Sequence, residues 1–251
     1  MNSASPTADP SPRPPPWRLD HSLLPALLGL AIVFLAAETT SLDFRVQDTL
    51  FNPATGAWLV DKQAPGLRAL FYTGPKIVLI ILGLVALVLA LGHARWRRLA
   101  PGWAHDRRGL LVVFLNLALV PLAIGQLKAA THIHCPAQLR RYGGDAPYRR
   151  VLECNTSTDT SETRGRCWPA GHASGGFALC ALAGLARTRR GQKVALAIAT
   201  AAGSTMGFYQ MAKGDHFLSH TLITACLAWI GFLLLRRIPF LRPVPPPAPH
   251  R

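Results

Sequence analysis

Acidic residues are scarce in this chain, and charge of either sign is sparse. Of 251 residues, 12 are Asp or Glu and 27 are Lys or Arg, so that only 16% are charged. Half of the residues are hydrophobic, and the mean hydropathy is +0.23. Several apolar runs approach or exceed the roughly 17–25 residues that a helix needs to cross a bilayer. The composition therefore excludes an ordinary soluble domain and predicts an integral membrane protein.

The sequence also lacks a basic motif interleaved with aromatic residues and an internal repeat of fixed period. The formal net charge of +15 would otherwise suggest nucleic acid as a partner. Much of the basic excess lies in short connections between apolar runs, where it determines membrane topology. We therefore expect no nucleic-acid partner.

No two of the five cysteines have the C-x-x-C spacing of a zinc or redox motif. Cys180 and Cys226 lie in apolar runs and are expected to be packing residues. Cys135, Cys154 and Cys167 share one polar loop, where a disulfide can form if the loop faces an oxidising compartment. Among the three pairings we prefer Cys135 with Cys167.

The chain divides into a membrane domain, 21–237, and two tails. Residues 1–20 are rich in Pro, Ser and Arg and are predicted to be a disordered cytoplasmic tail, and residues 238–251 form a proline-rich tail. The first apolar run, 23–37, fits either a cleaved signal peptide or an uncleaved first span, and we favour the span.

The predicted fold class is all-α, a polytopic membrane helix bundle with about six transmembrane helices. The expected spans are 23–37, 70–91, 109–127, 170–186, 194–212 and 217–235. The connections on one side of this layout, at 93–108 and 187–193, are short and basic like both tails, which makes that side cytoplasmic. The connections at 43–68, 128–168 and 213–216 then face outward, and the first of them is expected to hold a short interfacial helix around Trp58.

A glycine-rich helix start, CWPAGHASGG from Cys167 to Gly176, is the most informative stretch. Pro169 suits a first helical turn, and the free N–H groups that follow would favour an anion. His172 lies in that turn and can exchange a proton near neutral pH. Lys128 and His216 lie on the same outward side. The alternative interpretation is a helix start with a hydrogen-bonded structural histidine.

A second polar group follows the fifth span. Gln210, Lys213, His216 and His220 recur at spacings that would place them on one helical face, unless Gly214 breaks the helix. They could instead be interfacial anchors beside lipid headgroups.

A metal site is a further interpretation, because His132, His134 and Cys135 are close in sequence, as are His216 and His220. Lysines flank both groups and would repel a cation, so the pattern favours an anion and no metal is predicted.

Lys128, CWPAGHASGG and KGDHFLSH resemble the three signature blocks of the type-2 phosphatidate phosphatase superfamily, membrane lipid-phosphate phosphatases related to vanadium haloperoxidases. The family pattern is Lys-x6-Arg-Pro, then Pro-Ser-Gly-His, then Ser-Arg-x5-His-x3-Asp. By this resemblance Lys128 would bind phosphate, His172 would be the general acid, and His216 would form a phosphohistidine. Helix-terminal N–H groups at Ala170 and Gly171 would stabilise the phosphoryl oxygens.

Several positions depart from that pattern: Cys135 replaces the Arg although Pro136 is retained, Ala170 replaces the Ser, Tyr209–Gln210 replace Ser–Arg, and His220 replaces the Asp that orients the nucleophile. Lys213, with Gln210, is expected to supply one missing phosphate contact, and Arg140 or Arg141 another. His220 or Asp145 is the expected orienting group, because Asp215 would point away from His216 on a helix. An inactive relative stays open.

The resemblance implies a phosphatase that removes phosphate from a lipid phosphate or diphosphate at the outward face, with no metal or organic cofactor. The expected partners are the bilayer and a phospholipid or polyprenyl phosphate substrate, and the expected location is a bacterial inner membrane with the site facing the periplasm. Two alternatives stay open: a lipid phosphotransferase that uses the same intermediate, and a non-catalytic protein that binds or transports anionic headgroups.

Overall fold

A computed structural model describes residues 23–92, 106–154 and 164–241 of the chain. The predicted tail 1–20 and the Ser/Thr-rich stretch at 155–163 lie outside the described residues. The second tail lies outside them from residue 242 onward, and its first part forms a short 3-10 turn, Pro239–Leu241, in which Leu241 is buried.

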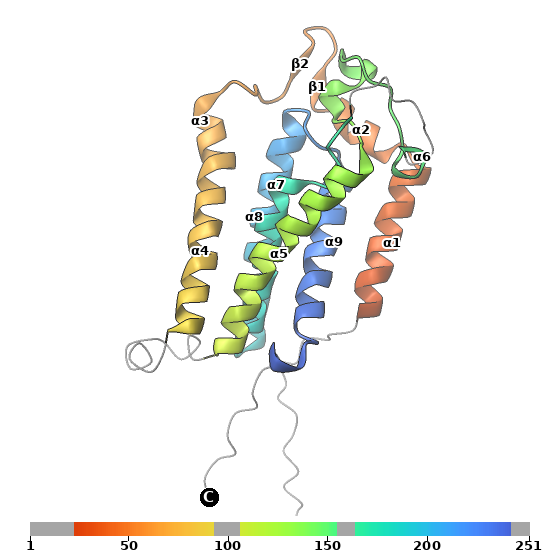
Figure 1. The fold of residues 1–251 in the computed structure, drawn as a ribbon. Coiled ribbons are helices and arrows are strands. Elements are labelled where there is room, and N and C mark those ends of the chain that lie inside the picture. The colour runs from red at the N-terminus through yellow and green to blue at the C-terminus, as the bar shows by residue number, and fades with distance from the viewer. Residues whose placement is uncertain (1–22, 93–105, 155–163, 242–251) are drawn as a thin grey trace, which may run out of the picture.

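Helices occupy all six segments that the sequence predicts (Figure 1). They are α1 (Leu23–Thr39), α4 (Gly74–Leu91), α5 (Arg107–Thr131), α7 (Gly171–Ala178) continued by a 3-10 helix (Leu179–Gly184), α8 (Arg189–Ala212) and α9 (Leu218–Leu235). The all-α class is therefore confirmed. The third helix extends past its predicted end at 127, and this extension includes Lys128 in its last turn.

Within the described ranges, three helical stretches are long and apolar enough to cross a membrane: 65–91, 107–138 and 218–235. A fourth results if α1 and α2 (Leu42–Asp48), which meet at a bend of 74°, count as one span. Among the described residues, α7 is too short by itself, and α8 is long enough but less apolar. The structure thus supports a polytopic membrane protein.

The helix predicted around Trp58 is wrong. Phe51–Asn52 (β1) and Ala57–Trp58 (β2) form a two-stranded antiparallel hairpin, and the helices of this connection lie at its two ends, α2 before the hairpin and α3 (Pro65–Arg68) after it. The turn residues NPATG close the hairpin, because Gly56 adopts the positive φ of 65° that a tight turn needs. Trp58 packs on Phe51 and on Tyr142, at ring-centroid distances of 4.9 and 5.1 Å.

Helix α7 lies in the middle of the bundle, where it packs against α5, α8 and α9. Its glycines permit close approach: a Cβ on Gly176 would lie 2.6 Å from the backbone nitrogen of Gly203 in α8. The helix tightens into the 3-10 turn at Leu179. There the buried Asn116 of α5 donates to the carbonyl of Ala178 at 2.8 Å, which satisfies a backbone group at the change of helix type.

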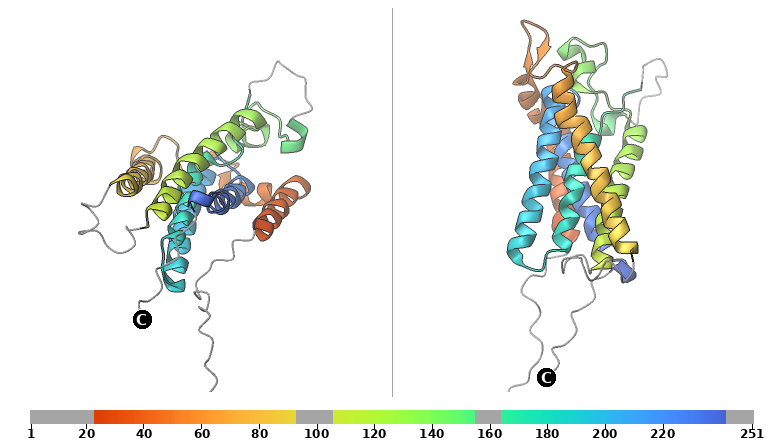
Figure 2. Two further views of the ribbon diagram at one scale, coloured as in Figure 1. Left: turned by 60° about the horizontal axis from the view of Figure 1, so that its bottom comes forward. Right: turned by 90° about the vertical axis from the view of Figure 1, so that its left-hand side faces the viewer.

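The described parts of the three connections that were predicted to face outward, 43–68, 128–168 and 213–216, gather at one end of the bundle (Figures 1 and 2). The hairpin, α2, α6 (Val151–Cys154) and the connection between α8 and α9 meet there, and α3 (Pro65–Arg68) leads from them into α4. Two backbone hydrogen bonds hold the α8–α9 connection: the N–H of Val60 donates to Ala212 at 3.0 Å, and the N–H of Ala137 donates to Gly214 at 2.9 Å. The sidedness predicted for these connections relative to one another is therefore confirmed.

Candidate active site

Three segments that are far apart in sequence converge at this end of the bundle. Lys128, in the last turn of α5, lies against the start of α7, since a Cβ on Gly171 would be 3.4 Å from its Nζ. The hydroxyl of Thr131 donates to the carbonyl of Trp168 at 2.9 Å and so joins the end of α5 to the loop before α7. Lys128 therefore lies close to the glycine-rich start of α7, as the sequence predicts.

Helix α7 begins later than predicted, because Pro169 was expected in its first turn and the helix starts at Gly171. Pro169 follows a cis peptide bond and precedes the helix, whose N-cap is Ala170. We had expected the N–H of Ala170 to bind phosphate. It donates instead to the carbonyl of His220 at 3.3 Å and is therefore not a free donor. Because Ala170 has no capping side chain, the anion-binding N–H groups would be those from Gly171 onward.

The predicted helical face across Gly214 is also wrong, although its residues remain close. Helix α8 ends at Ala212, and Gly214 has a φ of +77° with Trp58 packed where a side chain would be. The chain therefore turns at Gly214, and His216 precedes α9 while His220 lies in its first turn.

His216 is deeply buried, with 4% of its surface exposed, in the connection between α8 and α9. Its Nδ1 lies 3.5 Å from Sγ of Cys167, and its backbone hydrogen bond with Cys167 favours the charged form. Burial outweighs this contact and lowers the pKa of His216 well below its usual value, with smaller contributions from His220 and the nearby lysines. The imidazole is therefore neutral near pH 7, as a nucleophile must be.

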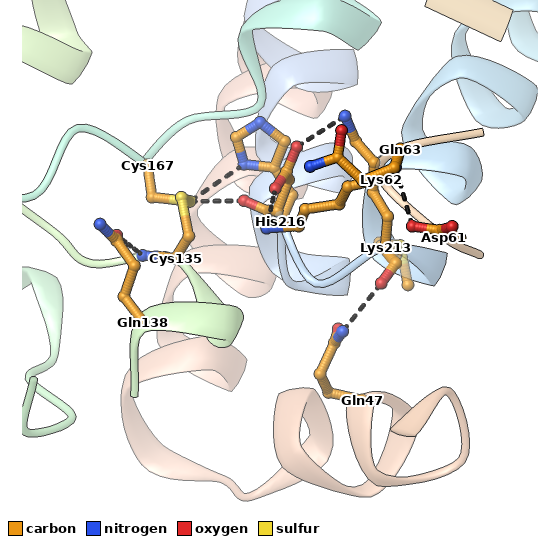
Figure 3. Close-up of polar contacts among 11 residues, drawn as sticks. Gln47, Asp61, Lys62, Gln63, Cys135, Gln138, Cys167, Lys213 and His216 are labelled. Carbon is orange, nitrogen blue, oxygen red and sulfur yellow. Dashed lines mark hydrogen bonds and ion pairs between the residues drawn. A yellow bond between two sulfur atoms is a disulfide. The ribbon is translucent and has the colours of Figure 1, made fainter. Parts of the chain in front are cut away.

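The preferred disulfide, Cys135–Cys167, is formed, with Cα atoms 5.1 Å apart (Figure 3). It joins the loop after α5 to the loop before α7, directly beside His216. The side chain of Gln138 accepts a hydrogen bond from the N–H of Cys135 at 2.8 Å and braces the first of these loops.

Cys167, His216 and His220 offer metal-ligand atoms within 4.8 Å of one another. The sulfur of Cys167 belongs to the disulfide and is no thiolate, so only the two imidazoles remain as ligands of this set. Two neutral histidines beside lysines are a poor cation site, and an anion suits the charge better.

Neither expected orienting group is hydrogen-bonded to His216 among the described residues. His220 contacts it ring to ring, with centroids 5.7 Å apart, and the Nδ1 of His220 has no partner there. Asp145 lies in the loop after α5, where its backbone carbonyl accepts from Arg140 at 3.1 Å. The residue that contacts His216 is instead Cys167. The sequence could not show this contact, because Cys167 and His216 meet only in the folded chain.

Two lysines converge on a single carboxylate near His216 (Figure 3). Lys213 and Lys62 each lie within ion-pair distance of Asp215, at 2.8 and 2.9 Å from its two oxygens. The charge of Lys213 is therefore partly neutralised. The sequence analysis had expected this lysine to be free to bind phosphate. Lys62 was not predicted, because it belongs to the connection after the hairpin.

Among the remaining predicted phosphate contacts, Gln210 is available to bind an anion and the two arginines are not. Gln210 is buried and its Nε2 has no hydrogen-bond partner among the described residues, which is consistent with a donor kept for an anion. Arg141 instead forms a two-pronged contact with Asp48, at 2.6 and 3.0 Å. With Arg140 on a backbone carbonyl, neither arginine takes the expected place of the missing family arginine.

His172 contacts the turn that precedes α4. Its Nε2 lies 2.9 Å from the carbonyl oxygen of Phe71, and its ring stacks on Tyr72 with centroids 4.2 Å apart. Lys213 lies over the same tyrosine ring at 5.4 Å, so Tyr72 connects His172 with the α8–α9 connection.

A buried acid that the sequence reading missed supports the start of α9. Asp43 of α2 accepts hydrogen bonds from the backbone N–H and the hydroxyl of Ser219, at 2.8 and 2.5 Å. One turn later, Gln47 donates to the carbonyl of Met211 at the end of α8 at 2.9 Å (Figure 3). The i, i+4 spacing of two polar residues in a short amphipathic helix was the available signal.

Comparison with known proteins identifies the family. The model of the PAP2 superfamily matches residues 109–243, more than half of the 251-residue chain. Among solved structures, the chain is similar to the crystal structure of the first transmembrane PAP2 type phosphatidylglycerolphosphate phosphatase from Bacillus subtilis. The identity is 16% and the TM-score 0.49, over 85% of this chain and 94% of that one. A comparison with curated proteins gave no match.

The family match includes Lys128, the start of α7 and the α8–α9 connection, the three segments that the fold brings together. The chain therefore belongs to the PAP2 superfamily and is an integral membrane phosphatase of that superfamily.

Proposed function

We propose that the chain hydrolyses a lipid phosphate or diphosphate through a phosphohistidine on His216. The observation that carries the proposal is the buried, neutral imidazole of His216 at the end of the bundle where Lys128 meets the start of α7. A neutral ring supplies the lone pair for attack, and a lysine with helix-terminal N–H groups stabilises the phosphoryl oxygens. The position of this group at the end of a membrane helix bundle favours a substrate whose headgroup lies at the bilayer surface.

The first step forms a bond from His216 to phosphorus and breaks the bond from phosphorus to the lipid oxygen. His172 donates a proton to that leaving oxygen, so the lipid departs as an alcohol or, from a diphosphate, as a monophosphate. In the second step His172 takes a proton from water, whose oxygen attacks the phosphohistidine. Inorganic phosphate leaves and His216 regains its lone pair.

The nitrogen that attacks is Nε2 of His216, because Nδ1 faces Cys167. Cys167 takes the place of an orienting carboxylate, since its backbone is hydrogen-bonded to the ring and its sulfur lies 3.5 Å from Nδ1. This accounts for the replacement of the family aspartate by His220 without loss of the nucleophile's orientation.

The substrate classes that fit are polyprenyl diphosphate, phosphatidate, phosphatidylglycerol phosphate and lipid A phosphate. The positive-inside distribution of the basic connections favours an outward site, which in a bacterial inner membrane faces the periplasm. Free phosphate release in the presence and absence of an added lipid alcohol separates hydrolysis from transfer to a lipid hydroxyl.

The test is phosphate release from a panel of these lipids by the purified protein, with and without EDTA. We expect EDTA to have no effect, and His216→Ala and His172→Ala each to lower the rate by about 10²-fold or more. His134→Ala, a histidine at the same end of the bundle with no role in the mechanism, is the matched control. Metal-dependent release, or release that survives both site substitutions, would overturn the mechanism.

A further inference from the structure

The start of the second membrane helix has an unusual geometry with a cause in the sequence. Between α3 and α4, residues Ala69–Thr73 form one turn of π-helix, in which the N–H of Gly74 donates to the carbonyl of Ala69, five residues earlier. In a regular α-helix the carbonyl of Phe71 would accept from residue 75. That residue is Pro75, which has no N–H.

Gly74 makes the same turn sterically feasible. A Cβ at this position would lie 2.8 Å from the carbonyl oxygen of Ala69, closer than such contacts are found. The Gly74–Pro75 pair therefore encodes the π-turn and leaves the carbonyl of Phe71 without the helical donor that residue 75 would have supplied.

That carbonyl is used by the candidate site. It lies 2.9 Å from Nε2 of His172, and the next residue, Tyr72, stacks on the same imidazole at an interplanar angle of 10°. Two consecutive residues thus fix both the plane of the ring and the direction of one nitrogen.

The π-turn is itself braced against α8. Phe71 stacks on Tyr209, with ring centroids 5.5 Å apart, and Lys213 lies over the rings of Tyr72 and Tyr209 at 5.4 and 5.1 Å. The turn is therefore packed between the helix that carries His172 and the connection that carries His216.

We propose that Phe71 and Tyr72 are positioning residues for the proton donor, presented by the π-turn that Gly74–Pro75 encodes. In the acid form His172 is an imidazolium with a proton on each nitrogen. The Phe71 carbonyl holds the Nε2–H, so that the proton transferred to the leaving oxygen is the one on Nδ1 and the ring is left neutral. Nδ1 takes a proton back from water in the second step, and Nε2–H stays on the carbonyl throughout. This inference rests on the proposed role of His172.

The test compares two substrates of the full-length protein: a lipid phosphate, whose alkoxide leaving group needs a proton, and a nitrophenyl phosphate ester, whose leaving group does not. We expect Tyr72→Leu and Pro75→Ala to lower kcat on the lipid phosphate by about 10-fold or more with KM nearly unchanged, and to leave nitrophenyl release within about two-fold. Tyr72→Phe retains the ring and should restore the rate. Pro121→Ala, the same change inside α5, is the matched control for Pro75→Ala.

A spectroscopic readout accompanies the kinetics. In protein with ¹⁵N-labelled histidine at a pH where the His172 ring is neutral, His172 should show the Nε2–H tautomer. Pro75→Ala should mix the tautomers, because the new N–H competes for the Phe71 carbonyl. Equal losses on both substrates in Tyr72→Leu, or a tautomer unaffected by Pro75→Ala, would overturn the positioning role. His172→Ala separates the two proposals: if it too lowers both substrates equally, the acid assignment itself fails.

Discussion

The sulfur of Cys167 lies 3.5 Å from Nδ1 of His216 and is bonded to Cys135, so a disulfide lies directly beside the proposed nucleophile. It connects two loops that are 32 residues apart in sequence. The N–H of Cys167 also donates to the carbonyl of Ile133 at 2.8 Å, which ties the same two loops through the backbone. We therefore expect the disulfide to position His216 as well as to stabilise the fold.

Removal of the disulfide should lower both stability and activity. For Cys135→Ser/Cys167→Ser we expect a loss of about 2–4 kcal/mol in unfolding free energy and a fall in kcat, because the unfolded chain gains freedom and the loop beside His216 loosens. Thermal unfolding and phosphate release with and without a reductant measure the two effects. Cys226→Ser is the control, and a reduced protein as active and as stable as the oxidised one would contradict the prediction.

Asp43 lies outside the signature blocks, but we expect it to contribute to the stability of the protein. Asp43→Ala leaves the buried N–H and hydroxyl of Ser219 without their acceptor, which costs roughly 1–3 kcal/mol. We expect a lower unfolding temperature together with a lower kcat, because Ser219 lies between His216 and His220. Asp61→Ala, in an exposed turn, should change neither. A thermal melt of Asp43→Ala that overlays the wild type would rule out this role.

His216, the proposed nucleophile, should remain active in mildly acidic solution. Because the pKa of His216 lies well below the value of about 6.5 of an unfolded histidine, its ring stays neutral as the pH falls through that value. The acid limb of the kcat profile should therefore begin below pH ~6.5. A rate profile between mildly acidic and neutral pH, measured in a single detergent, checks this, and an acid limb centred near the unperturbed value would refute it.

The same shift has a consequence for folding. The unfolded chain binds a proton at His216 that the native state does not, so stability is greatest above pH ~6.5 and falls as the pH drops toward the folded-state pKa. Unfolding midpoints of the wild type should decline over this range more steeply than those of His216→Gln. Parallel curves for the two proteins would show that His216 is not the group responsible.

The ion pairs of Asp215 with Lys62 and Lys213 should moderate the affinity for an anionic substrate. Asp215→Asn releases both ammonium groups, and we expect KM to fall by about two- to five-fold, which corresponds to the upper part of the roughly 0.2–1 kcal/mol of a partly exposed ion pair. Added salt should reduce the difference. Asp48→Asn, which releases Arg141 away from the site, should leave KM unchanged, and an increased KM in Asp215→Asn would contradict this role.

The sequence by itself determined the membrane class, the six helical segments and the grouping of Lys128, His172 and His216 at one end of the bundle. Hydropathy and charge distribution are sufficient for this, because apolar runs must cover their backbone with helix and basic connections set their sides. The polar loop that holds Cys135, Cys154 and Cys167 restricted a disulfide to three pairings, and the structure forms the preferred one, Cys135 with Cys167.

Only the tertiary structure decided the contacts that each site residue makes. The N–H of Ala170 was expected to bind phosphate and bonds to His220 instead, and Lys213 was expected to be free and pairs with Asp215. Asp43 and the carbonyl of Phe71 come from helices outside the signature blocks, so no motif includes them. Burial requires every polar group to find a partner, and which partner it finds depends on segments that meet only after the chain has folded.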